Sequence, residues 1–162
     1  MAERKRDVNS WVGLQVGGVS YALNILSVRE IIRPLPMQTL PHSADTVIGV
    51  VDHRGDVVPV VDLRVRFGTT ARTDLAHTRW VIVNRGPRLY GLVVDRVTEV
   101  FTLNEADARQ VPDLGPGAER RGIVAAYTYG GRLVFVLDLE RITQIDESVL
   151  PPLELPANSE AP

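Results

Sequence analysis

The side chains that could perform catalysis are few and scattered. The three histidines, His42, His53 and His77, lie too far apart in the chain for a local two-histidine metal site. The chain has no cysteine, and Lys5 is its single lysine. It contains neither a G-x-S-x-G nucleophile elbow nor a G-x-x-x-x-G-K-[ST] phosphate loop. The sequence therefore predicts a protein that is not an enzyme and that needs no cofactor or metal.

Two aspartates are the nearest approach to a catalytic carboxylate pair. Asp62 and Asp138 each follow an apolar run and precede a short helical pattern. Aspartic proteases share one proton between two such carboxylates. The nearest match to their motif, Asp45-Thr46-Val47, lacks the glycine after the threonine. Because aspartate is favoured at helix N-caps, we expect Asp62 and Asp138 to cap helical turns rather than catalyse.

Charged residues suited to recognition occur around Arg54 and Glu30. Arg54 precedes Gly55 in a polar loop, where its guanidinium would offer a rigid fork of donors to a carboxylate or to backbone carbonyls. Glu30 and Glu99 each lie among apolar residues and, in a strand, would face away from them. Each would be solvated, or paired with an arginine of the same face or of a partner. His53 is expected in a solvated turn or in a recognition loop.

These residues must be positioned by strands, because the β signal dominates the chain. Short runs rich in Val, Ile and Leu recur between Gly, Pro and Asp residues. Gly17-Gly18 and Gly130-Gly131 each separate two such runs and predict tight hairpins, since glycine readily adopts a positive φ. Asn104 is the expected N-cap of one helical turn. Helical turns are expected at 62–67, 104–108 and 138–145.

The chain also contains an internal repeat. Residues 16–32 align without a gap with 85–101, and residues 55–63 align with 131–139. Glycine, tyrosine and acidic positions match as well as the aliphatic ones. The sequence thus predicts two copies of one β unit of about 60 residues. Five short strands per copy suit a small barrel, and units this small are expected to share a hydrophobic core.

Five segments follow one another in a recognisable order: 19–23, 28–32, 47–50, 54–63 and 91–97. With this pattern the sequence resembles the CheW-like family over 11–145. The family pattern usually has Asn-Leu before its Arg-Gly pair, whereas this chain has Asp52-His53 there. The fold that the resemblance implies is all-β with short helices, built as two pseudo-symmetric five-stranded SH3-like barrels on a shared hydrophobic core.

The resemblance implies a non-enzymatic adaptor that couples chemoreceptors to a CheA-type histidine kinase in bacterial chemosensory signal transduction. Its implied partners are the regulatory domain of that kinase and the cytoplasmic helical hairpin tip of methyl-accepting chemoreceptors. Its implied location is the cytoplasm, at receptor arrays on the inner face of the membrane. The departure at 52–53 keeps open a CheW-like module of a parallel pathway governing motility or development. The residues carried over to partner binding are Val28, Glu30, Ile31, Arg54 and Gly55, with Gly55 shaping the turn.

Length, composition and charge narrow the classes of function that the chain could have. The 162 residues are 44% hydrophobic, which is typical of a globular domain. A net charge of −2 and few aromatic residues argue against a nucleic-acid-binding barrel. No apolar run is long enough to span a membrane, and the charged N-terminus does not resemble a secretory signal. A small β-barrel hydrolase remains an alternative, weakened by the lack of a nucleophile and base.

The expected organisation is one domain between two tails. A flexible N-terminal tail is predicted at 1–10, and a CheW-like domain at 11–146, with interlocked halves at about 11–68 and 79–146. A Pro-rich flexible tail is predicted at 147–162, since four prolines in 150–162 disfavour helix and central strand. That tail also has the composition of a polyproline II ligand.

Overall fold

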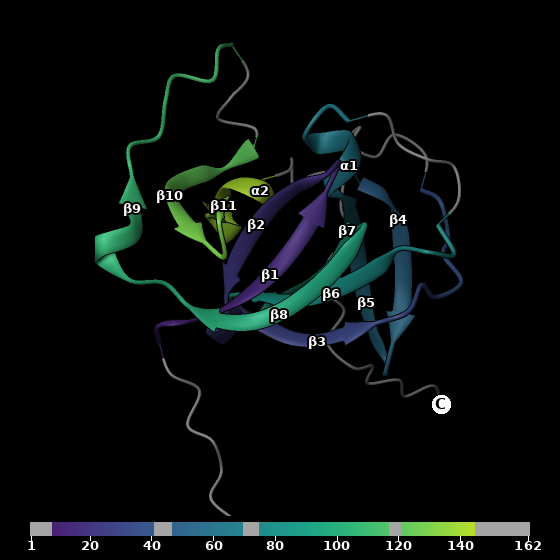
Figure 1. Ribbon diagram of the computed structural model, residues 1–162. Coiled ribbons are helices and arrows are strands. Elements are labelled where there is room, and N and C mark those ends of the chain that lie inside the picture. Colours follow the sequence, from purple (N-terminus) through teal and green to yellow (C-terminus); the bar gives the residue numbers. More distant parts are fainter. Residues whose placement is uncertain (1–7, 41–46, 70–74, 117–120, 145–162) are drawn as a thin grey trace, which may run out of the picture.

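The computed structural model describes residues 8–40, 47–69, 75–116 and 121–144 (Figure 1). The predicted C-terminal tail at 147–162 lies outside the described residues, as do residues 1–7 of the predicted N-terminal tail at 1–10, His42 and the Asp45-Thr46 pair. The first strand begins at Ser10. Before it, the Val8 carbonyl accepts a hydrogen bond from the Asn24 side chain at 2.8 Å. Residues 8–10 of the expected tail are therefore bonded to the fold.

The strands form two sheets. The six-stranded sheet has the order β8-β1-β2-β11-β10-β9, and the five-stranded sheet has the order β3-β6-β7-β5-β4. The strands of the first are β1 (Ser10–Val16), β2 (Val19–Asn24), β8 (Arg96–Thr102), β9 (Ala108–Arg109), β10 (Ile123–Tyr129) and β11 (Arg132–Leu137). Those of the second are β3 (Val28–Ile32), β4 (Val47–His53), β5 (Asp56–Asp62), β6 (Arg79–Arg85) and β7 (Arg88–Val94).

The helices are single turns, which confirms the predicted all-β class with short helices. Among the described residues, no helix is long and apolar enough to cross a membrane. The sequence predicts Asn104 as the N-cap of one helical turn, but its side chain makes no capping hydrogen bond. Its 3-10 turn is closed by the backbone instead, since the Asp107 amide donates to the Asn104 carbonyl at 2.9 Å. The helices are η1 (Ile25–Ser27), α1 (Leu63–Arg66), η2 (Glu105–Asp107) and α2 (Leu139–Ile142).

The two sequence repeats exchange their first hairpins. Hairpin β1–β2 of the first repeat lies in one sheet with β8 to β11 of the second, and hairpin β6–β7 of the second lies with β3 to β5 of the first. Among the described residues, strand pairing within a repeat is limited to hairpins, to β9 with β10, and to one isolated bridge. The repeats are joined by the antiparallel pairs β1·β8 and β3·β6 and the parallel pairs β2·β11 and β5·β7. Segments 11–68 and 79–146 are therefore repeats of sequence, and each of the two sheets takes strands from both of them.

The difference of one strand between the sheets is small. The additional strand β9 pairs Arg109 with Ala126 on β10. In the first repeat, Gln38 makes an isolated bridge to Val50, at the position of β4 that matches Ala126. The two sheets are thus five-stranded units with the same short addition, which agrees with the predicted pseudo-symmetry.

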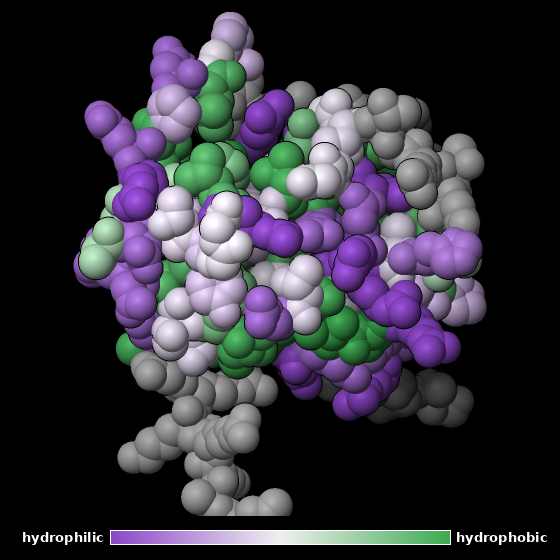
Figure 2. All heavy atoms as spheres, viewed as in Figure 1, coloured by the Kyte–Doolittle hydropathy of each residue, from purple (hydrophilic) through white to green (hydrophobic). Residues whose placement is uncertain are grey.

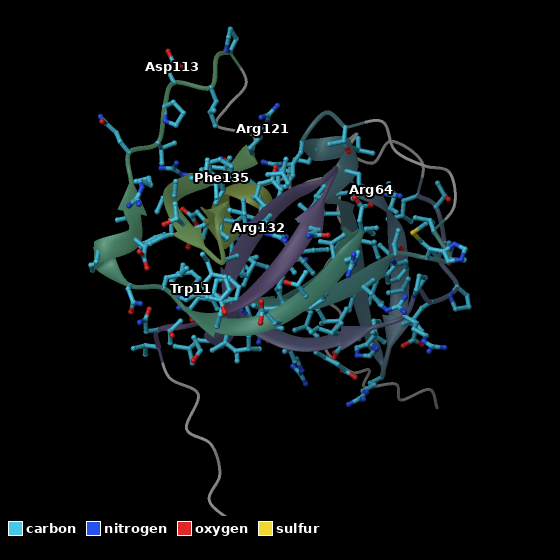
Figure 3. The ribbon with its side chains drawn as sticks, viewed as in Figure 1. Trp11, Arg64, Asp113, Arg121, Arg132 and Phe135 are labelled. Carbon is cyan, nitrogen blue, oxygen red and sulfur yellow. The ribbon has the colours of Figure 1, made fainter. Side chains whose placement is uncertain are left out.

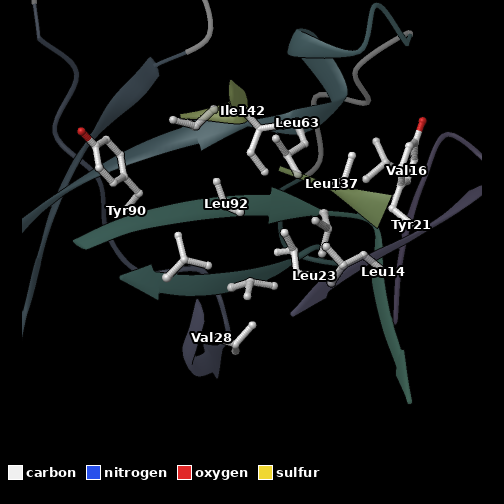
Figure 4. Close-up of a cluster of buried hydrophobic side chains, with 14 of the residues drawn as sticks. Leu14, Val16, Tyr21, Leu23, Val28, Leu63, Tyr90, Leu92, Leu137 and Ile142 are labelled. Carbon is white, nitrogen blue, oxygen red and sulfur yellow. The ribbon is translucent and has the colours of Figure 1, made fainter. Parts of the chain in front are cut away.

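A shared core joins the sheets (Figure 4). Leu14 and Leu23 of the six-stranded sheet and Leu92 of the five-stranded sheet are each at most 1% exposed in one cluster. Ile142 and Leu63, from the two α-helical turns, close the same cluster. Each sheet also has a smaller core of its own, the first built around Phe101, Val134 and Val136 and the second around Val58, Val60 and Trp80. The predicted shared hydrophobic core is present.

Candidate functional site

The turn between β4 and β5 holds an arginine in a costly conformation. Arg54 has φ 55° and Gly55 has φ 87°, so both central residues have the positive φ of a type I′ turn. The Asp52 carboxylate accepts from the Gly55 amide at 3.0 Å. Among the described residues, Arg54 is the only non-glycine residue with a positive φ. This backbone conformation costs a residue with a side chain about 1–2 kcal/mol, so the fold places a guanidinium at this tip at the expense of stability.

Glu30 on β3 binds this turn through both carboxylate oxygens. Oε1 accepts from Nη2 of Arg54 at 2.8 Å, and Oε2 lies 2.9 Å from Nε2 of His53. The side chains of Arg54, Glu30 and His53 are 74%, 26% and 10% exposed. We call these three residues the Glu30 cluster. It ties strand β3 to the β4–β5 turn through charge-assisted contacts, which are stronger than neutral ones.

Of the two apolar side chains predicted for partner binding, one lies at the surface and the other lies in the core. Ile31 is 44% exposed beside Glu30, whereas Val28 is 7% exposed and packs in the shared core. The register of β3 against β6 shifts between Val28 and Glu30, which changes how these neighbours alternate. Ile31 is therefore available for direct contact with another molecule, and Val28 supports the strand from beneath.

The structure identifies the ion-pair partner of Glu30, which the sequence left open, and it adds His53 to the site. The arginine paired with Glu30 belongs to the same chain. His53, expected in a loop, is instead the last residue of β4 and is 9% exposed. The alternation at the end of β4 was the available signal, since Val51 and His53 point inward while Asp52 points outward.

The two matched aspartates are caps, as the sequence predicts. Asp62 accepts from the Arg64 amide at 2.9 Å, and Asp138 accepts from the Glu140 amide at 3.0 Å. Asp62 also forms a buried ion pair with Arg64, at 2.8 Å between Oδ2 and Nη2. The hydrogen bonding of the Arg64 guanidinium to the Asp62 carboxylate, which accepts, raises the pKa of Arg64 further above its usual value, and burial acts against this. Within the described ranges, no group of three His, Cys, Asp or Glu residues could hold a metal ion.

Comparison with known proteins identifies relatives along most of the chain. A sequence model of the CheW-like domain matches residues 10–147. The chain is 30% identical over 149 residues to the chemotaxis protein CheW of Helicobacter pylori, covering 89% of this chain and 87% of that protein. It is 30% identical over 139 residues to CheW of Rhizobium meliloti, covering 84% and 88%. Protein FrzA of Myxococcus xanthus is 28% identical over 129 residues, covering 78% and 80%.

A solved structure has the same fold. The crystal structure of the scaffolding protein TtCheW from Thermoanaerobacter tengcongensis superposes with a TM-score of 0.72 at 22% sequence identity. The superposition covers 86% of this chain and 90% of that one. The arrangement of two sheets around a shared core is therefore common to both proteins.

Proposed function

The chain belongs to the CheW-like family, and from this we propose that it is a non-enzymatic adaptor that couples chemoreceptors to a CheA-type histidine kinase. Relatives named chemotaxis protein CheW, matched over most of their length, support the proposal. The proposed partners are the regulatory domain of the kinase and the cytoplasmic helical hairpin tip of the receptors. The proposed place of action is the cytoplasmic face of the membrane, at receptor arrays.

The Glu30 cluster is the observation that supports this proposal at the level of particular residues. Arg54 uses one nitrogen, Nη2, to bind Glu30, and its other donors make no hydrogen bond within the described part of the chain. A guanidinium has five N–H donors, so this one is held in place with most of its fork free. A helical partner that lays an apolar stripe on a surface usually places charges at the edge of that stripe. Ile31 would meet the stripe, and Arg54 would meet the charges.

Val28 and Gly55 take supporting roles in this proposal. Val28 packs under β3 in the shared core and keeps Ile31 and Glu30 at the surface. Gly55 permits the positive φ that turns the chain tightly after Arg54. The proposed partner-binding set is thus Val28, Glu30, Ile31, Arg54 and Gly55.

The test measures receptor binding and kinase activation with the receptor fragments and CheA-type kinase of the same organism. Arg54→His shortens the side chain and removes the fork. We expect it to weaken binding of the receptor fragment by about 1–3 kcal/mol and to reduce kinase activation. Arg88→His, on the β6–β7 hairpin of the same sheet, is the matched control and should bind normally. A receptor–kinase assembly that forms and activates normally with Arg54→His would remove Arg54 from the site.

A second candidate function is a CheW-like module of a parallel chemosensory pathway. It is favoured by the Asp52-His53 departure, which places a buried histidine against Glu30, and by the similarity to FrzA. Capture of partners from native cytoplasm with the unaltered protein, and with Glu30→Ala as the control, distinguishes the two. Recovery of a kinase and receptors that control swimming supports the first candidate, and recovery of a separate set supports the second.

A further inference from the structure

The internal repeat gives the Glu30 cluster a counterpart on the six-stranded sheet, and this counterpart is open. The alignment of the repeats places the three members of the cluster onto Glu99, Tyr129 and Gly130. All three line a hollow of about 190 Å³. Residue 130 has no side chain to occupy the position that Arg54 takes in the first repeat. The same architecture therefore forms a filled, ion-paired site in one repeat and a cavity in the other.

The wall of the hollow is aromatic. Phe101 on β8 stacks on Tyr129 on β10, with ring centroids 4.3 Å apart and an interplanar angle of 21°. Gly13 on β1 makes room for this wall, since a Cβ there would come within 2.9 Å of Cε1 of Phe101 and would collide with Thr98. Figure 2 shows pale and hydrophilic residues mixed over β1 and β8 on this face. The hollow thus offers flat ring surface among polar groups.

The edge of the hollow carries positive charge without a partner. Arg132, at the start of β11, lines the hollow, and Arg121 lies just before β10; Figure 3 labels both. Neither arginine side chain makes a hydrogen bond or ion pair with another described residue. Burial raises the pKa of the Tyr21 hydroxyl and the charge of Arg121 lowers it, so the field of Arg121 reaches a residue that lines the hollow. Glu99 is the single carboxylate among the residues described as lining it.

The C-terminal part of this chain has the complementary chemistry. Residues 150–156 read Leu-Pro-Pro-Leu-Glu-Leu-Pro. Proline-rich segments dock in aromatic-lined grooves, because their extended conformation is set before binding and little entropy is lost. Residues 145–162 contain no basic residue and carry the carboxylates of Asp146, Glu147, Glu154 and Glu160. The segment therefore matches both the rings and the positive edge.

We propose that the hollow binds residues 150–156 of the same chain, with Pro151 and Pro152 against the Phe101–Tyr129 rings and Glu154 at Arg132. Strand β11 runs from the hollow toward α2, and its six residues span about 20 Å. The seven residues from 145 to 151 reach about 23–25 Å when extended. This proposal does not depend on the receptor and kinase proposed above.

The experiment uses the absence of cysteine from the chain. A nitroxide spin label on Ala157→Cys in the full-length, ¹⁵N-labelled protein is the only labelled position. We expect loss of amide signal intensity at Gly130, Gly131 and Phe101, relative to the same sample with the label reduced. Gly55, in the matching turn of the other sheet, should keep its intensity. High salt should restore part of the lost intensity, because charge pairing contributes to binding.

Charge variants identify the contact. Arg132→Glu and Glu154→Arg should each restore the amide signal intensity at Gly130 and Gly131. The double variant should lose that intensity again. The matched controls change the same charges elsewhere: Arg96→Glu lies on β8 outside the hollow, and Glu160→Arg lies in the tail outside 150–156. Both controls should leave the pattern of the unaltered chain. Dispersed amide signals in every variant show that the fold is retained.

Three outcomes would overturn the proposal. The first is full intensity around the hollow in the labelled chain. The second is an equal loss of amide signal intensity at Gly55 and at Gly130, which indicates a tail that samples the whole surface. The third comes from mixing spin-labelled ¹⁴N chain with unlabelled ¹⁵N chain: loss at Gly130 in that sample assigns the hollow to the tail of a second copy.

Discussion

Arg54 destabilises the fold through its backbone conformation, and it places an exposed, oriented charge at the surface. Its positive φ is unfavourable for a residue with a side chain. The ion pair with Glu30 returns little of that cost, since contacts of exposed pairs contribute about 0–1 kcal/mol and the Arg54 side chain is 74% exposed. This cost is consistent with the partner contact that we propose for Arg54.

The pair of Glu30 and Arg54 can be separated by a double-mutant cycle. Using Glu30→Ala, Arg54→Ala and the double variant, we expect a coupling of about 0.2–1 kcal/mol in the free energy of unfolding, because the contact is largely exposed. Receptor binding should fall by about 1–3 kcal/mol for Arg54→Ala. The double variant should bind no more weakly than Arg54→Ala, since Glu30 acts by positioning Arg54. Strictly additive losses in binding would instead give Glu30 its own contact with the partner.

The matched caps Asp62 and Asp138 should differ in their contribution to stability. Asp62→Ala removes a cap and also the carboxylate that pairs with the Arg64 guanidinium, whose side chain is 4% exposed. Loss of one partner from a buried ion pair costs about 3–5 kcal/mol. Asp138→Ala removes a cap whose ion pair with Arg141 is long, 3.6 Å, and exposed, so about 0.5–2 kcal/mol is expected.

Denaturant unfolding of the two aspartate variants measures this difference directly. Receptor binding serves as the control: Asp138 follows β11 of the six-stranded sheet, whereas the Glu30 cluster lies on the five-stranded sheet, and Asp138→Ala should bind normally. Equal destabilisation by the two substitutions would mean that the Asp62–Arg64 pair adds nothing beyond the cap.

At the scale of the element, the β4–β5 and β10–β11 hairpins provide an internal comparison. Gly55 and Gly131 occupy the same turn position in the two repeats, with φ 87° and 79°. A Cβ at either would meet no atom within 4 Å. Substitution therefore perturbs backbone conformation alone. Only the β4–β5 turn, however, is tied to another strand by the Glu30 cluster.

Gly55→Ala and Gly131→Ala should accordingly have the same effect on stability and different effects on binding. Each should cost about 1–2 kcal/mol, the penalty of positive φ for a residue with Cβ. Gly55→Ala should also weaken receptor binding, because relief of the strain shifts Arg54 away from Glu30. Thermal unfolding and titration with the receptor fragment give the two quantities. If Gly131→Ala impairs receptor binding as much as Gly55→Ala does, the partner surface extends to the second sheet.

At the scale of the whole molecule, the exchanged hairpins make the two repeats interdependent. Apart from β9 with β10, the pairings that extend the described sheets beyond hairpins all join one repeat to the other. The shared core likewise draws on both sheets (Figure 4). A single repeat would expose unpaired strand edges and half of the shared core, which is unfavourable for so small a unit.

Neither half should therefore fold alone. Fragments 1–68 and 71–162 should each lack a cooperative melt and dispersed amide shifts. Mixed in equal amounts, they should form a complex with the amide spectrum of the intact protein, because every missing strand partner is then supplied. Calorimetry and amide spectra of the separate and mixed fragments provide the measurement. A cooperative melt of either fragment by itself would contradict the interlocked architecture.

Much of this structure could be predicted from the sequence, because its determinants are local. The Gly17-Gly18 and Gly130-Gly131 turns follow from the ease with which glycine adopts a positive φ. The caps at Asp62 and Asp138 depend only on residues two positions further along. The repeat and the CheW-like resemblance come from the order of such local patterns along the chain. Strands, hairpins, helical turns and family were therefore readable without coordinates.

Non-local pairing decided the rest. Local patterns identify hairpins, but which hairpin joins which sheet depends on contacts between the repeats, so the exchange was not predictable. The choice of Arg54 as the partner of Glu30 and the burial of His53 follow from the placement of β3 against the β4–β5 turn. Val28 enters the shared core because one face of β3 meets the other sheet. Sequence specifies which side chains alternate, and only the packing of the two sheets determines which face becomes interior.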